Sequence, residues 1–386
     1  MNRILKYASL LAAAVMLIAC EGQTDTGQTG GTNKSLQLTS DKNLIQTFGG
    51  DYATLTVTLD GVPVTDEVIF FDGNNEVIEI PDFKFTATEV GEYKIWANYG
   101  TYISETVTIK AIDVQIPETP ADPKPASTDF KARVLLTEFT TVGCSACPSM
   151  KKVLHAIEED AAMAENIIFT ECHSGLVGGQ ADPCYLHNSA FEEFCMVTGF
   201  PTVKLDLAAT YNNGNSLDLK SDVKELADAK SSYAPGIAVN SVLENGKVVA
   251  KVTVKAKIAS NYRVGAFLVE DGIYAKQTNT TDEYMHTHNG VIRYVDSQYK
   301  GTFYGVPVAE IAAGKTADTM ISWLLDDIWA YGTDKGEING GVAWPARNDE
   351  NLHMVVYVSM SDGKGGYVVA NAIDCPINGV TPFEYK

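Results

Sequence analysis

The sequence predicts a chain of several domains: a β-sandwich towards the N-terminus, an α/β domain in the middle and a second β-sandwich at the end. Apolar and polar residues alternate as in strands over residues 36–112, and a strand, helix, strand order begins at Phe130. Strand patterning returns over about the last 150 residues. The length of 386 residues also exceeds the size at which one hydrophobic core usually stops growing.

The first residues have the pattern of a secretory signal followed by a tether. Arg3 and Lys6 precede an apolar run that is too short to span a membrane comfortably. The run ends in "LIAC", which resembles the lipobox of bacterial lipoproteins. We therefore expect a signal peptide over 1–19 and a flexible tether over 20–35. The resemblance implies that Cys20 is lipidated and anchors the chain to a membrane.

The charge of the chain limits its partners. Its formal net charge is −20 at pH 7. Binding to nucleic acid needs lysine and arginine to neutralise phosphates, so we expect no nucleic acid partner. Such acidity fits an exported protein that stays apart from its neighbours.

Residues 36–113 are expected to form an immunoglobulin-like β-sandwich. About seven short strands alternate in this segment, and Asp-Gly, Gly-Asn and Tyr-Gly breaks separate them. Tyr93 and Trp96 are the expected aromatic anchors of its core. A linker over 114–129 follows, with four prolines and no apolar periodicity, and is expected to be a semi-rigid spacer.

The middle of the chain, residues 130–233, has the pattern of an α/β domain. A continuous apolar run precedes a helical pattern in which Met150, Val153, Leu154 and Ile157 recur at helical spacing. A second apolar strand and a right-handed parallel crossover are expected next. A later helix is expected to begin at Ser221. The β-sandwich predicted over 234–386 includes a helix over 317–332.

The pair Cys144 and Cys147 raises the question of function. A C-x-x-C spacing serves as a redox pair, as half of a zinc site or as a small structural disulfide. Cys144 lies where the strand ends and the helix begins, and Pro148 suits the first helical turn. A helix N-terminus favours a thiolate, so the position indicates redox chemistry.

Two further features are shared with one fold family. Pro201 stands at the start of a buried strand, which is a poor place for proline unless the preceding peptide bond is cis. Here the middle of the chain resembles the thioredoxin fold. The resemblance implies that Phe200, Pro201 and Thr202 bind an extended substrate. It also implies that Glu138, six residues before Cys144, accepts a proton from Cys147. Thioredoxins carry aspartate at that position.

The export signal together with "LLTEFTTVGCSACPSM", "ECHSG", "FPTVKLD" and "HNGVIRYV" resembles the 28-kilodalton outer-membrane-protein family of Bacteroidetes, over roughly residues 130–386. The resemblance implies a lipoprotein of the outer membrane, on its periplasmic face or at the cell surface. It implies little about a substrate.

The function expected from these features is that of a thiol-disulfide oxidoreductase that uses Cys144 and Cys147 on envelope or surface proteins, with no cofactor. One alternative is an adhesion or assembly lipoprotein in which the pair is a structural disulfide. The other is a metal site made by Cys144, Cys147, Cys172 and His173.

Other cysteines and histidines leave further questions open. Cys184 pairs with Cys195 or with Cys172 in the two bridges considered, and Cys375 is either free or bridged across domains. The segment "MHTH" places His286 and His288 on one face if it is extended, although no third metal ligand stands nearby in the sequence.

Overall fold

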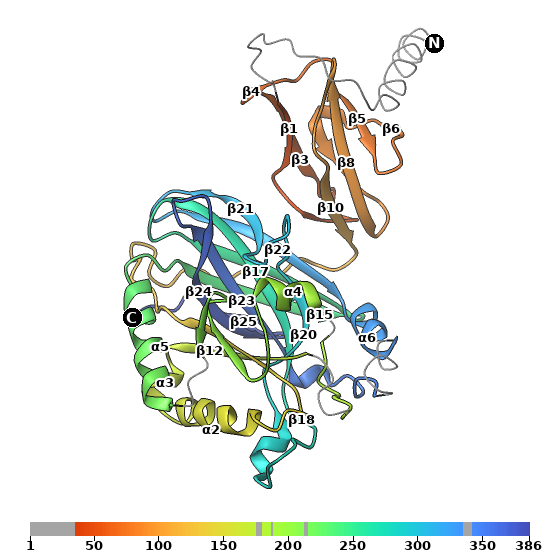
Figure 1. Cartoon of the computed structure of the whole chain (residues 1–386). Helices are drawn as coiled ribbons and strands as arrows, with labels where there is room; N and C mark the ends of the chain where they lie inside the picture. The colour runs from red at the N-terminus through yellow and green to blue at the C-terminus, as the bar shows by residue number, and fades with distance from the viewer. Residues whose placement is uncertain (1–34, 175–179, 187, 212–214, 335–341) are drawn as a thin grey trace, which may run out of the picture.

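The computed structural model describes residues 35–174, 180–186, 188–211, 215–334 and 342–386 (Figure 1). It shows a multidomain chain built mainly from β-sheets. The predicted signal peptide, Cys20 and nearly all of the predicted tether lie outside the described residues. Among the described helices, none has the length and apolarity needed to cross a membrane.

The N-terminal domain is a β-sandwich of two sheets, as the alternation predicts. One sheet contains β1 (Leu36–Ser40), β3 (Ala53–Leu59), β4 (Val62–Pro63) and β7 (Lys84–Phe85). The other contains β2 (Leu44–Gln46), β5 (Ile69–Asp72), β6 (Val77–Ile78), β8 (Gly91–Tyr99), β9 (Tyr102–Ile103) and β10 (Val107–Ile112). A short 3-10 helix, η2 (Pro81–Phe83), precedes β7.

Of the two aromatic residues predicted to anchor the core of this domain, Tyr93 does so and Trp96 does not. Tyr93 packs against the buried core together with Ile95 and Ala97. Trp96 lies on the opposite face of β8, where its ring stacks on Phe71 with centroids 4.0 Å apart. The period of two along a strand separates these aromatic residues, because positions 93 and 96 face opposite sides.

A nine-stranded sheet forms the centre of the remaining chain (Figure 1). Its order is β14-β13-β11-β12-β20-β17-β23-β24, and β21 also pairs with β17. Its strands are β11 (Val134–Thr140), β12 (Ile167–His173), β13 (Thr202–Leu205), β14 (Ala209–Tyr211), β17 (Ser260–Glu270), β20 (Val291–Asp296), β21 (Val306–Ile311), β23 (Leu352–Ser361) and β24 (Tyr367–Pro376). Glu171 of β12 pairs with Val291 of β20, so the sheet continues across residue 233.

A second sheet covers part of this one. It consists of β15 (Gly236–Glu244), β16 (Lys247–Lys255), β22 (Thr316–Leu324) and β25 (Val380–Thr381). Apolar residues such as Val252, Phe267 and Val356 form one buried cluster between the two sheets. The segment predicted to be helical over 317–332 begins as a strand and becomes α6 (Leu325–Asp334) only after Leu324. Its alternating residues pair with β16, which overrides the local helical pattern.

Helices cover the other face of β11 to β14. They are α2 (Cys147–Glu158), α3 (Ala161–Ala164) and α5 (Ser216–Lys230), and α4 (Ser189–Phe194) lies elsewhere on the body. The predicted stripe of α2 is buried against Val134 and Leu136, which confirms the helical period. The start expected at Ser221 is wrong, because Asn215 caps α5 by accepting a hydrogen bond from Leu217 N at 3.0 Å.

The predicted Pro-rich linker is held against the second sheet. Asn240 Nδ2 donates to Glu118 O at 2.7 Å, and the hydroxyls of Thr119 and Thr253 are 2.7 Å apart. Lys255 Nζ donates to Asp122 Oδ2 at 2.7 Å. The segment is therefore an ordered strap on β15 and β16 along these residues.

A buried ion pair joins α5 to the central sheet. Lys230 Nζ lies 2.8 and 2.9 Å from the two carboxylate oxygens of Asp206, and neither residue is exposed to more than a small extent. Asp206 Oδ1 also accepts from Leu135 N at 2.9 Å. The pair therefore fixes the helix to the strand that leads to Cys144.

Lys230→Met is expected to lower the free energy of unfolding by about 3–5 kcal/mol at pH 7, because it leaves the buried Asp206 carboxylate without its counter-ion. Urea unfolding followed by circular dichroism measures the change. The matched control is Lys224→Met on the same helix, which removes an exposed pair with Asp228 and costs at most about 1 kcal/mol. Equal losses in the two variants would contradict this role.

Candidate functional site

Cys144 and Cys147 form a disulfide at the start of α2, with their Cα atoms 5.4 Å apart. Pro148 occupies the first helical turn, as predicted. Cys147 N donates to Cys144 Sγ at 3.1 Å. Cys144 is only 4% exposed and Cys147 is fully buried. The bridge therefore lies at the helix N-terminus but presents little surface to solvent.

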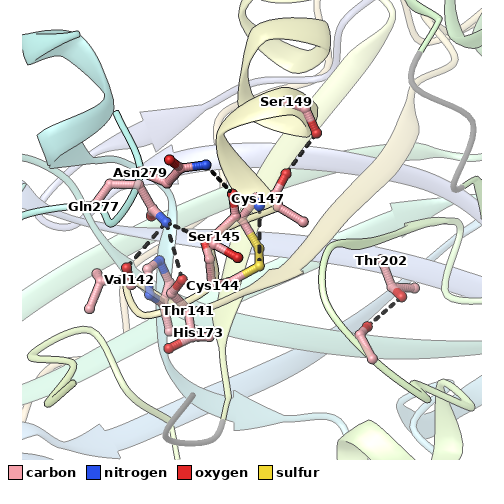
Figure 2. Close-up of a disulfide and its surroundings, with 12 residues drawn as sticks. Thr141, Val142, Cys144, Ser145, Cys147, Ser149, His173, Thr202, Gln277 and Asn279 are labelled. Carbon is pink, nitrogen blue, oxygen red and sulfur yellow. Dashed lines mark hydrogen bonds between the residues drawn. A yellow bond between two sulfur atoms is a disulfide. The ribbon is translucent and has the colours of Figure 1, made fainter. Parts of the chain in front are cut away.

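Two side chains from a distant part of the sequence hold the loop around the disulfide. They follow β18 (Ile273–Tyr274) and reach the residues just before α2, as Figure 2 shows. Gln277 Nε2 donates to the carbonyl oxygens of Thr141, Val142 and Cys144 at 3.4, 3.2 and 3.0 Å. Asn279 Nδ2 donates to Ser145 O at 3.0 Å. We call Gln277 and Asn279 the amide clamp.

Glu138 is fully buried in β11, on the face that α2 covers. Its two carboxylate oxygens have no hydrogen-bond partner among the described residues. It pairs across the parallel strands with Glu171, so the two side chains emerge about 4.8 Å apart. Burial, and then the negative charge of Glu171, raise the pKa of Glu138 to about 8. Glu138 therefore holds its proton at neutral pH.

Glu171 is the centre of a buried network of charges. Lys151 Nζ is 3.1 Å from Glu171 Oε1. Glu171 Oε2 is 3.0 Å from His173 Nε2 and 3.1 Å from His288 Nδ1. Burial acts to raise the pKa of Glu171, but the charge of Lys151 and these hydrogen bonds hold it well below its usual range. Glu171 therefore stays ionised beside the protonated Glu138.

His173 forms a second buried ion pair, with Asp182. His173 Nδ1 is 2.8 Å from Asp182 Oδ2. Burial acts to lower the pKa of His173, but the charge and hydrogen bonds of Asp182 and Glu171 raise it to about 9. Asp182 also accepts from Val142 N and Cys184 N, each at 2.9 Å. The pair therefore anchors the loop that leads to Cys144.

The three residues expected to bind an extended substrate lie one strand from this loop. The Phe200–Pro201 peptide bond is cis. Thr202 begins β13 and pairs with Phe139 of β11, which places it near the end of the strand that leads to the disulfide. Its hydroxyl donates to Gly199 O at 2.7 Å. In the view of Figure 2, Thr202 lies on the opposite side of the disulfide from the amide clamp.

The metal site considered as an alternative, with Cys144, Cys147, Cys172 and His173 as ligands, does not assemble. Cys172 alternates with its neighbours along β12 and packs with Phe139 in the core on the opposite face of the sheet from His173. The histidines of "MHTH" also separate, since His286 Nδ1 accepts from Gln277 N at 3.1 Å while His288 joins the Glu171 network.

The other described cysteines are free thiols, and all are buried: Cys172, Cys184, Cys195 and Cys375. Neither bridge considered for Cys184 is therefore present. For Cys375, the open choice between a free thiol and a bridge resolves to the free thiol. Burial raises the pKa of the Cys172, Cys184, Cys195 and Cys375 thiols, which disfavours their thiolates.

Sequence reasoning missed three members of the site, namely Lys151, Glu171 and Asp182, and it singled out His288 only as a possible partner of His286. Lys151 is a single lysine in an amphipathic helix, and the side chains of such lysines usually lie in solvent, so nothing in the sequence indicates that it is buried. Glu171 and His173 alternate on an otherwise apolar strand, and that pattern is the one local indication of a buried polar face.

In comparisons with known proteins, one family model matches part of the chain. The model of the outer membrane protein Omp28 matches residues 188–316, about a third of the chain. The match supports an outer-membrane location for this protein. No curated protein matches the chain.

Two solved structures show partial similarity. HBP35 of Porphyromonas gingivalis is 17% identical, with a TM-score of 0.48, over 66% of this chain and 78% of that one. Domains 4–9 of the surface layer protein SbsC are 12% identical, with a TM-score of 0.15, over 91% of this chain and 51% of that one.

Glu138→Gln is expected to flatten the dependence of stability on pH. An acid with a raised pKa in the folded state stabilises the fold below its ordinary pKa of 4.5, and this contribution is lost as the pH rises to about 8. The variant cannot ionise, so its free energy of unfolding should gain on the wild type between pH 5 and pH 9. Urea unfolding at pH 5, 7 and 9 measures the gain.

The control for this experiment is the exposed Glu89→Gln, which should follow the wild type at every pH. If Glu138→Gln and Glu89→Gln show the same pH profile, Glu138 is not the buried acid described above.

Gln277→Ala should make the disulfide easier to reduce. The variant removes hydrogen bonds to three carbonyl groups, each with a net value of about 1 kcal/mol, so we expect reduction by a phosphine to become at least about fivefold faster. Labelling of the released thiols with time measures the rate. Gln115→Ala, in the strap, is the control and should leave the rate of reduction unchanged. Equal rates in the wild type and both variants would show that the clamp does not protect the disulfide.

Proposed function

We propose that the chain is a lipid-anchored thiol-disulfide oxidoreductase of the outer membrane, in which residues 130–233 form a thioredoxin-like unit. The observation that carries the proposal is the Cys144–Cys147 disulfide at the N-terminus of α2, on the strand end that follows the buried Glu138. No part of this chemistry needs a cofactor.

The two cysteines have different roles. In the reduced protein, unpaired N–H groups at the helix start favour the thiolate of Cys144. This thiolate attacks one sulfur of a substrate disulfide, forms a mixed disulfide and releases the first substrate thiol. Cys147 then attacks Cys144 Sγ, closes the protein disulfide and releases the second substrate thiol. The protein loses the two electrons that the substrate gains, and the steps run backwards in an oxidase.

Glu138 supplies the proton acceptor for the second step. Cys147 must lose its proton before it attacks Cys144. With a pKa of about 8, Glu138 holds a proton in most molecules at neutral pH, and the ionised fraction accepts the proton of Cys147. Phe200, Pro201 and Thr202 are proposed to bind the substrate backbone, because β13 begins beside the strand that leads to Cys144.

Location restricts the substrates. A protein of the outer membrane meets exported proteins, whose disulfides form outside the cytoplasm. We therefore propose that the partners are envelope or surface proteins with disulfides or free thiols. The anchor in this proposal is lipid attached to Cys20.

A second function is favoured by the small exposure of Cys144. At 4% exposure and with the amide clamp in place, the bridge has the surroundings of a structural disulfide. Under this proposal the protein is an adhesion or assembly lipoprotein, and its β-sandwiches present the binding surfaces.

Turnover separates the two proposals. The full chain is expected to catalyse insulin reduction by dithiothreitol, and Cys144→Ser should lose at least about 99% of that activity because it lacks the attacking thiolate. Cys147→Ser should accumulate a mixed disulfide with the substrate, visible by mass spectrometry. Cys375→Ser, a distant free thiol in β24, is the matched control and should retain activity. If the wild type reduces insulin no faster than Cys144→Ser, the oxidoreductase is excluded and the proposal of a structural disulfide is supported.

A further inference from the structure

A set of soft and borderline metal donors gathers beside the disulfide but apart from it. His173, Cys184 and His288 are all buried, and their candidate donor atoms lie within 4.8 Å of one another. The two imidazole rings meet edge to face, with centroids 4.7 Å apart. The three residues come from β12, from the loop before α4 and from β19 (Thr287–His288), so only the fold brings them together.

A fourth donor stands between the histidines. Glu171 Oε2 is 3.0 Å from His173 Nε2 and 3.1 Å from His288 Nδ1. One carboxylate oxygen within reach of two imidazole nitrogens completes a set of two nitrogens, one sulfur and one oxygen. Tetrahedral zinc takes such ligands with donors about 3.3–3.6 Å apart, so the widest pair among the donors of His173, Cys184 and His288 would close by about 1 Å.

The outer nitrogen of each histidine is already fixed in the way that metal ligands require. His173 Nδ1 faces Asp182 Oδ2 at 2.8 Å, which leaves Nε2 for a metal. His288 Nε2 faces Ala275 O at 3.2 Å, which leaves Nδ1. A carboxylate and a backbone carbonyl behind ligating histidines are the partners that set their tautomers.

We propose that His173 Nε2, His288 Nδ1, Cys184 Sγ and Glu171 Oε2 form a binding site for Zn²⁺. Nitrogen and sulfur donors select zinc over magnesium and calcium, which prefer oxygen ligands. The site is closed by burial and uses four protein ligands, so its role is structural: it ties β12 and β19 to the loop that carries Cys184. It does not depend on whether Cys144 and Cys147 turn over.

Lys151 is the cation that zinc must displace. Its Nζ is 2.9 Å from His288 Nδ1 and 3.1 Å from Glu171 Oε1. Without metal, Lys151 and protonated His173 balance Glu171 and Asp182, while Glu138 keeps its proton. With zinc, His173 and Cys184 each release one proton. The ion and Lys151 then balance Glu171, Asp182 and the Cys184 thiolate, so the net charge of the buried cluster is unchanged.

The test uses the full chain with its disulfide intact, under nitrogen and without reductant. Zinc is added, excess is removed by gel filtration, and bound zinc is counted by mass spectrometry of the metal. We expect about one zinc per chain and a rise in the melting temperature. Cobalt added in place of zinc should give a thiolate charge-transfer band that is lost in Cys184→Ser.

Variants distinguish this site from a network of ion pairs. His288→Asn should lose at least about 90% of the bound zinc, whereas His155→Asn, at a half-buried histidine of α2, should keep it. Cys375→Ser is the matched control for Cys184→Ser. Lys151→Met should bind zinc at least about tenfold more tightly, because it removes the competing ammonium. Circular dichroism of each variant shows whether it is folded.

Two results would overturn the proposal. One is less than about 0.1 zinc per chain in both the wild type and Lys151→Met, since the second protein retains all four ligands and lacks the competitor. The other is zinc that remains in folded His288→Asn and Cys184→Ser at the wild-type level, which would place the ion elsewhere.

Discussion

The site depends on two carboxyl groups that the parallel register of β11 and β12 forces side by side. Glu138 and Glu171 are directly paired across these strands and both are buried. Two like charges so close in a medium of low polarity cannot both be ionised near neutral pH. The fold resolves the conflict unequally, because Lys151, His173 and His288 contact Glu171 and leave Glu138 without a hydrogen-bond partner among the described residues. One strand pairing therefore creates both the protonated Glu138 on the strand that leads to the disulfide and the anion that gathers the histidines.

The continuity of the large sheet brings the other half of the site into place. The single parallel pairing of Glu171 with Val291 joins β12 to β20, and β19 with its His288 lies immediately before β20. The same connection carries Gln277 to the loop before α2. The residues that hold the disulfide therefore come from the segment beyond residue 233, although the disulfide itself belongs to residues 130–233. Neither segment holds the complete site alone.

Local patterns predicted the parts of this structure that depend on one element. The stripe of α2, the position of Cys144 at a strand end and the placement of Pro148 follow from period and turn chemistry, which act over a few residues. The joined sheet, the clamp and the contacts of His288 with Lys151 and Glu171 depend on residues more than 90 positions apart, and no local rule reaches them. The predictions for Trp96 and for residues 317–332 were wrong for a related reason. Contacts with neighbouring strands determine which face of β8 is buried and whether the later segment forms a strand or a helix.

The clamp does not by itself make the disulfide inert. Gln277 donates to the loop through its amide nitrogen, but its Oε1 is buried with no hydrogen-bond partner among the described residues. A buried polar atom without a hydrogen-bond partner costs free energy, and this cost is recovered when the atom becomes exposed and hydrogen bonds to water. Swinging the amide outwards therefore exchanges weak or long hydrogen bonds for hydration of the whole group, and the net cost of opening is smaller than the count of bonds suggests. Local openings of this kind lie at the low end of the stability range of a protein. A nearly buried Cys144 is thus compatible with catalysis when a substrate meets the open form. The clamp then limits how often the open form is present.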